Sequence, residues 1–228
     1  MKPLEVTATL RGSVALPNGP MALDGIIAYA VAMEMGLVGA HLQDEIVPIK
    51  IPVKRHQRGT FHLASVGHCE VESSERRWLN RRFPTAEAQS LGSPKLKSYR
   101  IDSGACRSYR LPLATFHARD DLMTWWCVGD TAEVRRLLQL ISYVGKKRST
   151  GCGRVMRWDV RELDEAELWA GFPILRDGMP LRALPVDLDG LSDEAQRSYG
   201  TLTYPYWARW LEQPIAVPSD AIRMAVGA

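Results

Sequence analysis

Residues 131–160 read TAEVRRLLQLISYVGKKRSTGCGRVMRWDV. In the first part, apolar residues recur every three or four positions, which predicts a helix over Ala132–Val144 with Thr131 as its N-cap. The last part alternates along its length and predicts a strand over Val155–Val160. Between them, Gly145–Arg154 is a basic loop interrupted by glycines. The stretch therefore predicts a helix, a basic loop and a strand that follow one another directly.

Further elements follow upstream. Alternation predicts a strand over 4–16 with a bulge at Gly12, and good helix formers followed by Gly36 predict a helix over 23–35. More strands are expected at three places: Thr60–Val71, Leu111–Phe116 and Met123–Val128. Two prolines reduce 46–53 to an edge strand or an extended loop.

This order of elements matches a ferredoxin-like βαββαβ unit. We therefore expect an α+β protein with a ferredoxin-like, or RRM-like, core over residues 1–160. Within it, residues 73–110 are expected to form an inserted basic loop or projecting hairpin. Residues 161–228 are expected to form an acidic, proline-rich, irregular and β-containing extension that packs on the core. In the final strand, Val155 and Arg157 are expected to face away from Trp158.

Charge is distributed unevenly along the 228 residues. Residues 1–160 hold 23 Lys and Arg against 15 Asp and Glu, whereas residues 161–228 hold 6 against 11. Such asymmetry indicates a polyanionic partner. The chain has no apolar run long enough to span a bilayer and no secretory signal, so we expect a cytoplasmic protein without a membrane partner. Its four cysteines form no CxxC pair, so we expect neither a structural zinc site nor a cofactor.

The basic loop has the chemistry of a phosphodiester-binding site. Its cations supply charge, its hydroxyls supply hydrogen-bond donors, and its glycines allow close approach to main-chain N–H groups that can hold an anion. The sequence does not fit a mononucleotide P-loop, since Gly151 is followed by Cys152 rather than by Lys and Ser or Thr. The predicted RNA-binding residues of the loop are Lys146, Lys147, Arg148, Ser149, Thr150, Gly151, Gly153 and Arg154.

The insertion adds candidates of a second kind. Residues 73–110 carry nine Lys and Arg against three acidic residues, with aromatic residues interleaved. Four arginines have helical spacing, so one helical face is expected to follow phosphates, while two tyrosines are expected to stack on bases or to pack in the ordinary way. These residues are Arg76, Arg77, Arg81, Arg82, Tyr99 and Tyr109.

Two stretches resemble one known family. The loop at 145–154 resembles the glycine-rich loop of the RRM-like CRISPR proteins called RAMPs, and Leu23-Asp24-Gly25 with its flanks (16–30) resembles the first helix of the type IV effector subunit that caps the 5′ end of the guide RNA. The resemblance implies a group-five-like subunit that clamps the 5′ handle, with the guide RNA and the backbone and large subunits as partners. It leaves target DNA open as a further partner, and it implies that 73–110 is a thumb-like projection.

Two other functions stay open. Related family members cleave precursor RNA without a metal, and His56 in a basic loop and His117 beside Arg119 are the candidate general bases. No motif supports either histidine, so no catalytic or metal-binding residue is predicted. The other function is a structural protein whose basic face binds an acidic partner.

Overall fold

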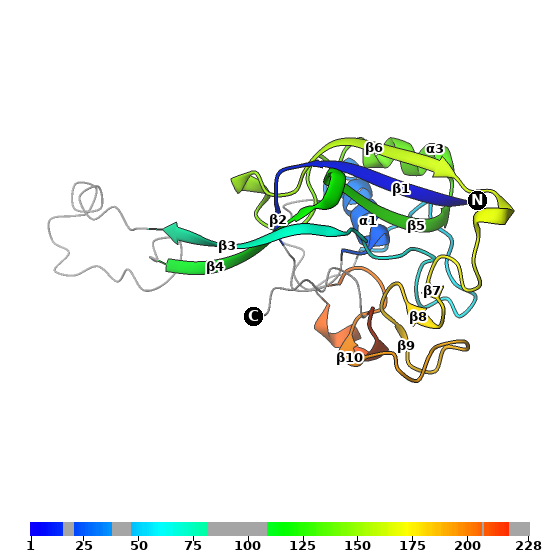
Figure 1. Ribbon diagram of the computed structural model, residues 1–228. Helices are drawn as coiled ribbons and strands as arrows, with labels where there is room; N and C mark the ends of the chain where they lie inside the picture. Colours follow the sequence, from blue (N-terminus) through cyan, green and yellow to red (C-terminus); the bar gives the residue numbers. More distant parts are fainter. Residues whose placement is uncertain (16–20, 38–46, 82–108, 207, 219–228) are drawn as a thin grey trace, which may run out of the picture.

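A computed structural model describes residues 1–15, 21–37, 47–81, 109–206 and 208–218, with the backbone alone for Arg81 (Figure 1). These residues form two α-helices and several antiparallel strand pairs, which confirms the predicted α+β class.

The central sheet has three strands in the order β5-β1-β6. Their bounds are Lys2–Arg11 for β1, Leu122–Gly129 for β5 and Arg154–Glu162 for β6. The first strand lies in the middle and is antiparallel to both neighbours. The strands predicted at the start of the chain and at 123–128 are therefore present.

The edge of this sheet beside β5 is irregular. Ala64 and His68 form isolated bridges with Cys127 and Thr124 of β5, but no continuous strand forms there. The prediction of a strand over 60–71 is therefore wrong. A ferredoxin-like unit would have a fourth regular strand at this edge, so the ferredoxin-like core is not confirmed.

Two helices cover one face of the central sheet (Figure 1). Helix α1 spans Leu23–Glu34 and helix α3 spans Thr131–Leu138. Alternate residues of β1 from Leu4 to Leu10 are buried against them, because successive side chains of a strand point to opposite faces. The predicted end of the first helix is confirmed, since Gly36 has a φ of +69° and its N–H bonds the carbonyl of Met33.

The helix predicted over 132–144 is wrong in its second half. Helix α3 ends at Leu138 because the following residues pair with the beginning of β6. The N–H of Val144 bonds the carbonyl of Gly153 at 2.8 Å, and the N–H of Val155 bonds that of Ser142 at 2.9 Å. The N-cap is Asp130 rather than Thr131, since its carboxylate accepts from the N–H of Glu133 at 2.9 Å.

The predicted faces of the last strand are also partly wrong. The pairing of β1 with β6 shifts by one residue after Thr9, which is the signature of a bulge. Met156 is consequently exposed, whereas Val155 lies buried together with Trp158 and Val160.

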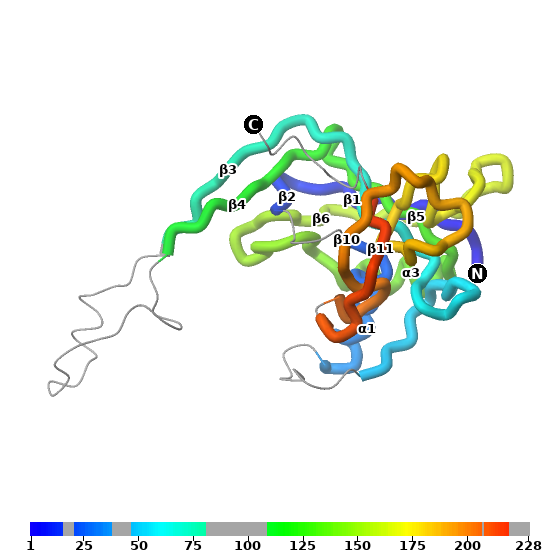
Figure 2. The backbone as a smooth tube through the Cα atoms, turned by 90° about the horizontal axis from the view of Figure 1, so that it is seen from below, coloured from blue at the N-terminus to red at the C-terminus, as the bar shows by residue number. Residues whose placement is uncertain are grey.

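A long hairpin projects from the body in both views (Figures 1 and 2). It consists of β3, Val71–Arg81, paired with β4, Tyr109–Ala118. Gly12, with a φ of +77°, turns the chain out of the central sheet, and β2, Val14–Ala15, then pairs with the base of β4. Arg76, Arg77 and Arg81 therefore lie on a strand, and the predicted helical face of arginines is wrong.

The last part of the chain forms short strand pairs below the central sheet (Figure 1). Their bounds are Leu175–Arg176 for β7, Met179–Pro180 for β8, Leu184–Pro185 for β9, Arg197–Gly200 for β10 and Gln213–Ala216 for β11. They enclose a second apolar cluster together with Phe61 of the irregular edge. No helix among the described residues is long and apolar enough to cross a membrane.

Candidate nucleic-acid interface

The basic loop at 145–154 is a compact turn held against the base of the hairpin. The N–H of Lys146 bonds the carbonyl of Ala15 at 3.1 Å, and the N–H of Gly153 bonds that of Ser13 at 2.9 Å. Cys152 is buried against Leu113 of β4. The sequence folds this way because hydrogen bonds to Ser13, between β1 and β2, and to Ala15 of β2 hold both ends of the loop.

Two glycines are required for this turn. Gly145 and Gly153 both have positive φ angles, of +76° and +67°. A Cβ at Gly145 would lie 2.6 Å from the carbonyl oxygen of Ala15, and one at Gly153 would lie 2.0 Å from that of Val144. Any larger residue would clash, so the shape of the loop requires glycine at both positions.

The loop's main-chain donors are partly used within the protein. Besides Lys146 and Gly153, the N–H groups of Thr150 and Gly151 bond the carbonyls of Lys147 and Arg148. The hydroxyl of Thr150 also donates to the carbonyl of Lys147, at 2.7 Å. These groups are satisfied without a ligand, so they are not available to bind an anion.

The charged side chains of the loop point to solvent. Lys147, Arg148, Ser149 and Arg154 are exposed, whereas Lys146 is half-buried. Arg11 of β1 lies directly opposite Arg154 of β6. Arg11 was not among the residues predicted from the sequence. Its position at a strand end, just before a glycine, is only a weak signal of a binding residue. Directly paired residues point to the same face, and like charges in such a pair destabilise a sheet. A bound phosphate between the two guanidinium groups would offset that repulsion.

The hairpin carries the second group of predicted residues. Arg76 and Arg77 are exposed and point to opposite faces of β3, as neighbours on a strand do. Arg77 pairs with Glu75 on its own strand. Tyr109 is half-buried at the start of β4. The side chain of Arg81 and the whole of Arg82 and Tyr99 lie outside the described residues.

An apolar pocket of about 570 Å³ opens beside the loop. Its walls come from α1, from residues 141–148 and from residues 204–206, and they include Tyr29, Tyr143 and Arg148. The Arg148 guanidinium lies 5.0 Å from the centre of the Tyr29 ring, within cation–π range. The loop and the pocket therefore share Arg148.

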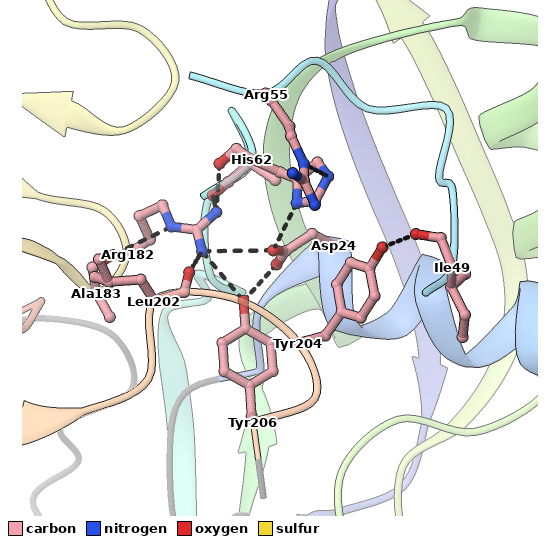
Figure 3. A network of polar contacts seen from close by, with 10 residues as sticks. Asp24, Ile49, Arg55, His62, Arg182, Ala183, Leu202, Tyr204 and Tyr206 are labelled. Carbon is pink, nitrogen blue, oxygen red and sulfur yellow. Dashed lines mark hydrogen bonds and ion pairs between the residues drawn. The ribbon is translucent and has the colours of Figure 1, made fainter. Parts of the chain in front are cut away.

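A buried polar network fixes the far wall of this pocket (Figure 3). Asp24, in the first turn of α1, is fully buried and accepts hydrogen bonds from Arg182 at 3.4 Å and from the Tyr206 hydroxyl at 2.7 Å. Arg182 is also fully buried, and it donates to the main-chain carbonyls of His62 and Leu202. This pair joins the C-terminal strands to α1.

The network shifts the pKa values of its members. Burial alone would raise the pKa of Asp24, but the Arg182 charge, together with the nearby His62 ring and the hydrogen bond from Tyr206, holds it below its ordinary value of 3.8. Burial and the adjacent Asp24 carboxylate raise the pKa of the Tyr206 hydroxyl. At neutral pH the network therefore includes the Asp24 carboxylate, the Arg182 guanidinium and the neutral Tyr206 hydroxyl.

The network explains the Leu23-Asp24-Gly25 stretch. Leu23 is buried in the core and Asp24 pairs with Arg182. A Cβ on Gly25 would lie 2.9 Å from the Tyr206 ring, so glycine provides the space for that ring. In this structure the stretch therefore holds the first helix in place.

The two candidate histidines lie on other segments than the basic loop. His56 stacks on Phe61, with ring centres 4.6 Å apart, and its Nδ1 accepts from the N–H of Arg58 at 3.3 Å. Burial and the nearby Arg58 charge lower the pKa of His56. His117 is half-buried on β4. Among the described residues, neither side chain is hydrogen-bonded to a second titratable group, and no cluster of His, Cys, Asp and Glu could hold a metal.

Comparison with protein-family models gives a match. The model of the family described as CRISPR type IV associated protein Csf3 matches residues 80–218. This range includes β4, β5, α3, the basic loop, β6 and the C-terminal strands. No curated protein matches the chain.

Proposed function

The chain belongs to the family of CRISPR type IV associated protein Csf3, and from this premise we propose that it binds the 5′ handle of the guide RNA within a type IV effector complex. Binding is noncovalent in this proposal, and the chain acts as an RNA-binding subunit of the complex rather than as an enzyme. Its other partners are the backbone and large subunits, with target DNA as a further candidate.

The observation that carries the proposal is the set of exposed cations around the basic loop. Lys147, Arg148, Arg154 and Arg11 come from the loop and from the two strand ends beside it. Phosphate contacts supply most of the affinity of a protein for a nucleic-acid backbone, and they need such a group of solvent-facing cations. An RNA strand that crosses this end of the sheet would be held by its phosphates.

The hairpin suits the same function. Arg110 lies over the exposed Trp78, 4.5 Å from the ring centre, so the hairpin presents both a cation and an aromatic surface. In this proposal it reaches toward the guide or toward a neighbouring backbone subunit.

The strand order β5-β1-β6, with the irregular segment beside β5, is compatible with a ferredoxin-like unit whose edge strand has lost its regularity.

A binding and cleavage experiment tests the proposal. Wild type and the Lys147→Ala/Arg148→Ala variant are mixed with end-labelled repeat RNA without metal, and native and denaturing gels are run in parallel. We expect intact RNA that is shifted by wild type and shifted less by the variant. The matched control is Lys2→Ala/Lys54→Ala. It removes the same charge from exposed positions at the other end of β1, where Lys2 and Lys54 lie beside Gly129 and Val128.

The other outcomes separate the two alternative functions. A discrete RNA fragment that disappears in His56→Ala or His117→Ala would establish the endoribonuclease. Equal binding by the loop variant and the control would contradict the assignment of the loop. If wild type does not bind the RNA at all, a structural protein with an acidic partner is favoured.

A further inference from the structure

We propose that the pocket beside the basic loop holds one unstacked nucleobase of the bound RNA. The inference deepens the proposed function and rests on it. It adds a second site, for a base, next to the cations that bind the backbone.

The shape of the pocket suits a flat aromatic ring. Its volume of about 570 Å³ lies in the range of pockets that enclose small organic ligands. Part of the lining consists of small side chains, which leave space for a ring: Ala22, which precedes α1, and Ala28 and Ala32 of α1. The rings of Tyr143 and Tyr204 also line the pocket.

The aromatic walls are held in place before any ligand binds. The Tyr204 hydroxyl donates to the carbonyl of Ile49, and the Tyr206 hydroxyl donates to Asp24 at 2.7 Å. Tyr204 also stacks on His62, with ring centres 5.6 Å apart (Figure 3). Rings fixed in this way lose little conformational entropy when a base stacks on them.

Charge complementarity favours a nucleotide over an apolar protein side chain. Arg148 lines the pocket and stacks over Tyr29, while Lys147 next to it is exposed. A base in the pocket would therefore bring its own phosphate to these two cations. An apolar side chain from a protein partner would fill the pocket but leave the cations without a counterion.

The lining also predicts how the base is recognised. The walls are mainly apolar and aromatic, and the Tyr204 and Tyr206 hydroxyls are already bonded within the protein. Stacking contributes affinity with any base, whereas discrimination among bases needs hydrogen bonds to their edges. Removing the base should therefore weaken binding more than exchanging it for another base.

The test uses the full chain and a set of single-stranded repeat RNAs, each with one abasic nucleotide. Fluorescence polarisation gives the affinity for each. In wild type we expect one position, or two neighbouring ones, at which loss of the base weakens binding roughly 5- to 150-fold, the range for stacking of one base on an aromatic side chain.

Variants then connect this position to the pocket. Ala32→Phe fills the space, and Tyr143→Ala removes a stacking ring, whereas Tyr143→Phe keeps the ring and should bind like wild type. For intact RNA, the first two variants should lose about as much affinity as the abasic substitution does. For the abasic RNA they should lose nothing more, because both changes remove the same contact.

The outcomes distinguish this inference from the proposed function. If wild type binds intact RNA and Lys147→Ala/Arg148→Ala weakens binding, but no abasic position matters, the base pocket is refuted while the loop assignment stands. Additive losses from Tyr143→Ala and the abasic substitution would also refute it, and the pocket would then suit a protein side chain. If wild type binds no RNA even at low salt, both are refuted.

Discussion

Replacing Arg182 by methionine should strongly destabilise the protein. Arg182 lies fully buried, and its guanidinium faces the Asp24 carboxylate at 3.4 Å. Methionine fills similar space but leaves the Asp24 charge buried without its countercharge. Removing one partner of a buried ion pair costs about 3–5 kcal/mol. Since native domains are stable by about 5–15 kcal/mol, the variant should lose a large part of its free energy of unfolding.

Urea denaturation followed by tryptophan fluorescence measures this loss. The matched surface control is Arg58→Ala, because Arg58 pairs with Asp187 at 3.0 Å in a partly exposed position, where a salt bridge contributes about 0–1 kcal/mol. The double variant Asp24→Asn/Arg182→Met should be more stable than Arg182→Met alone, since no buried charge remains. A loss for Arg182→Met that equals the Arg58→Ala loss would refute the reasoning.

Three further predictions concern the same region. The pKa of Asp24 is held below its ordinary value of 3.8 by the Arg182 charge, despite burial, so its stabilising contribution is present above that value and lost as pH falls below it. The free energy of unfolding should therefore fall more steeply in acid for wild type than for Asp24→Asn, and equal slopes would contradict the pairing. Gly25→Val should lower the melting temperature and cost about 1–3 kcal/mol, because its Cβ would meet the Tyr206 ring at 2.9 Å; an unchanged melting temperature would contradict this contact. Burial raises the pKa of the Cys127 thiol to about 12, so iodoacetamide should label Cys127 at mildly alkaline pH only after urea unfolding, and its labelling in the native protein would count against the buried position.

Elements with strong local signals could be predicted from the sequence. Strand β1 alternates along its length, and α1 ends at a glycine in the left-handed region, so both follow from residues close together in the chain. The basic loop could also be recognised from the sequence, because its glycines and lysines lie close together in the chain.

Features set by distant contacts could not be predicted. The residues after Leu138 have helical periodicity, but their main chain pairs with β6 instead. The bulge that buries Val155 depends on its register with β1. Nothing local to Arg182 shows that an arginine in an acidic segment is buried against Asp24, 158 positions away. Arg11 joins the loop's cations only because β1 and β6 pair.

The central claim is that the cations of the basic loop contact RNA phosphates. The most direct test is the salt dependence of repeat-RNA binding by wild type, Lys147→Ala/Arg148→Ala and the control Lys2→Ala/Lys54→Ala. For single strands, each phosphate contact contributes about 0.7 to the slope of log K against log salt. The account predicts that the loop variant's slope is shallower than wild type by about 1.4, while the control's slope is unchanged. Equal slopes for the loop variant and wild type would contradict it.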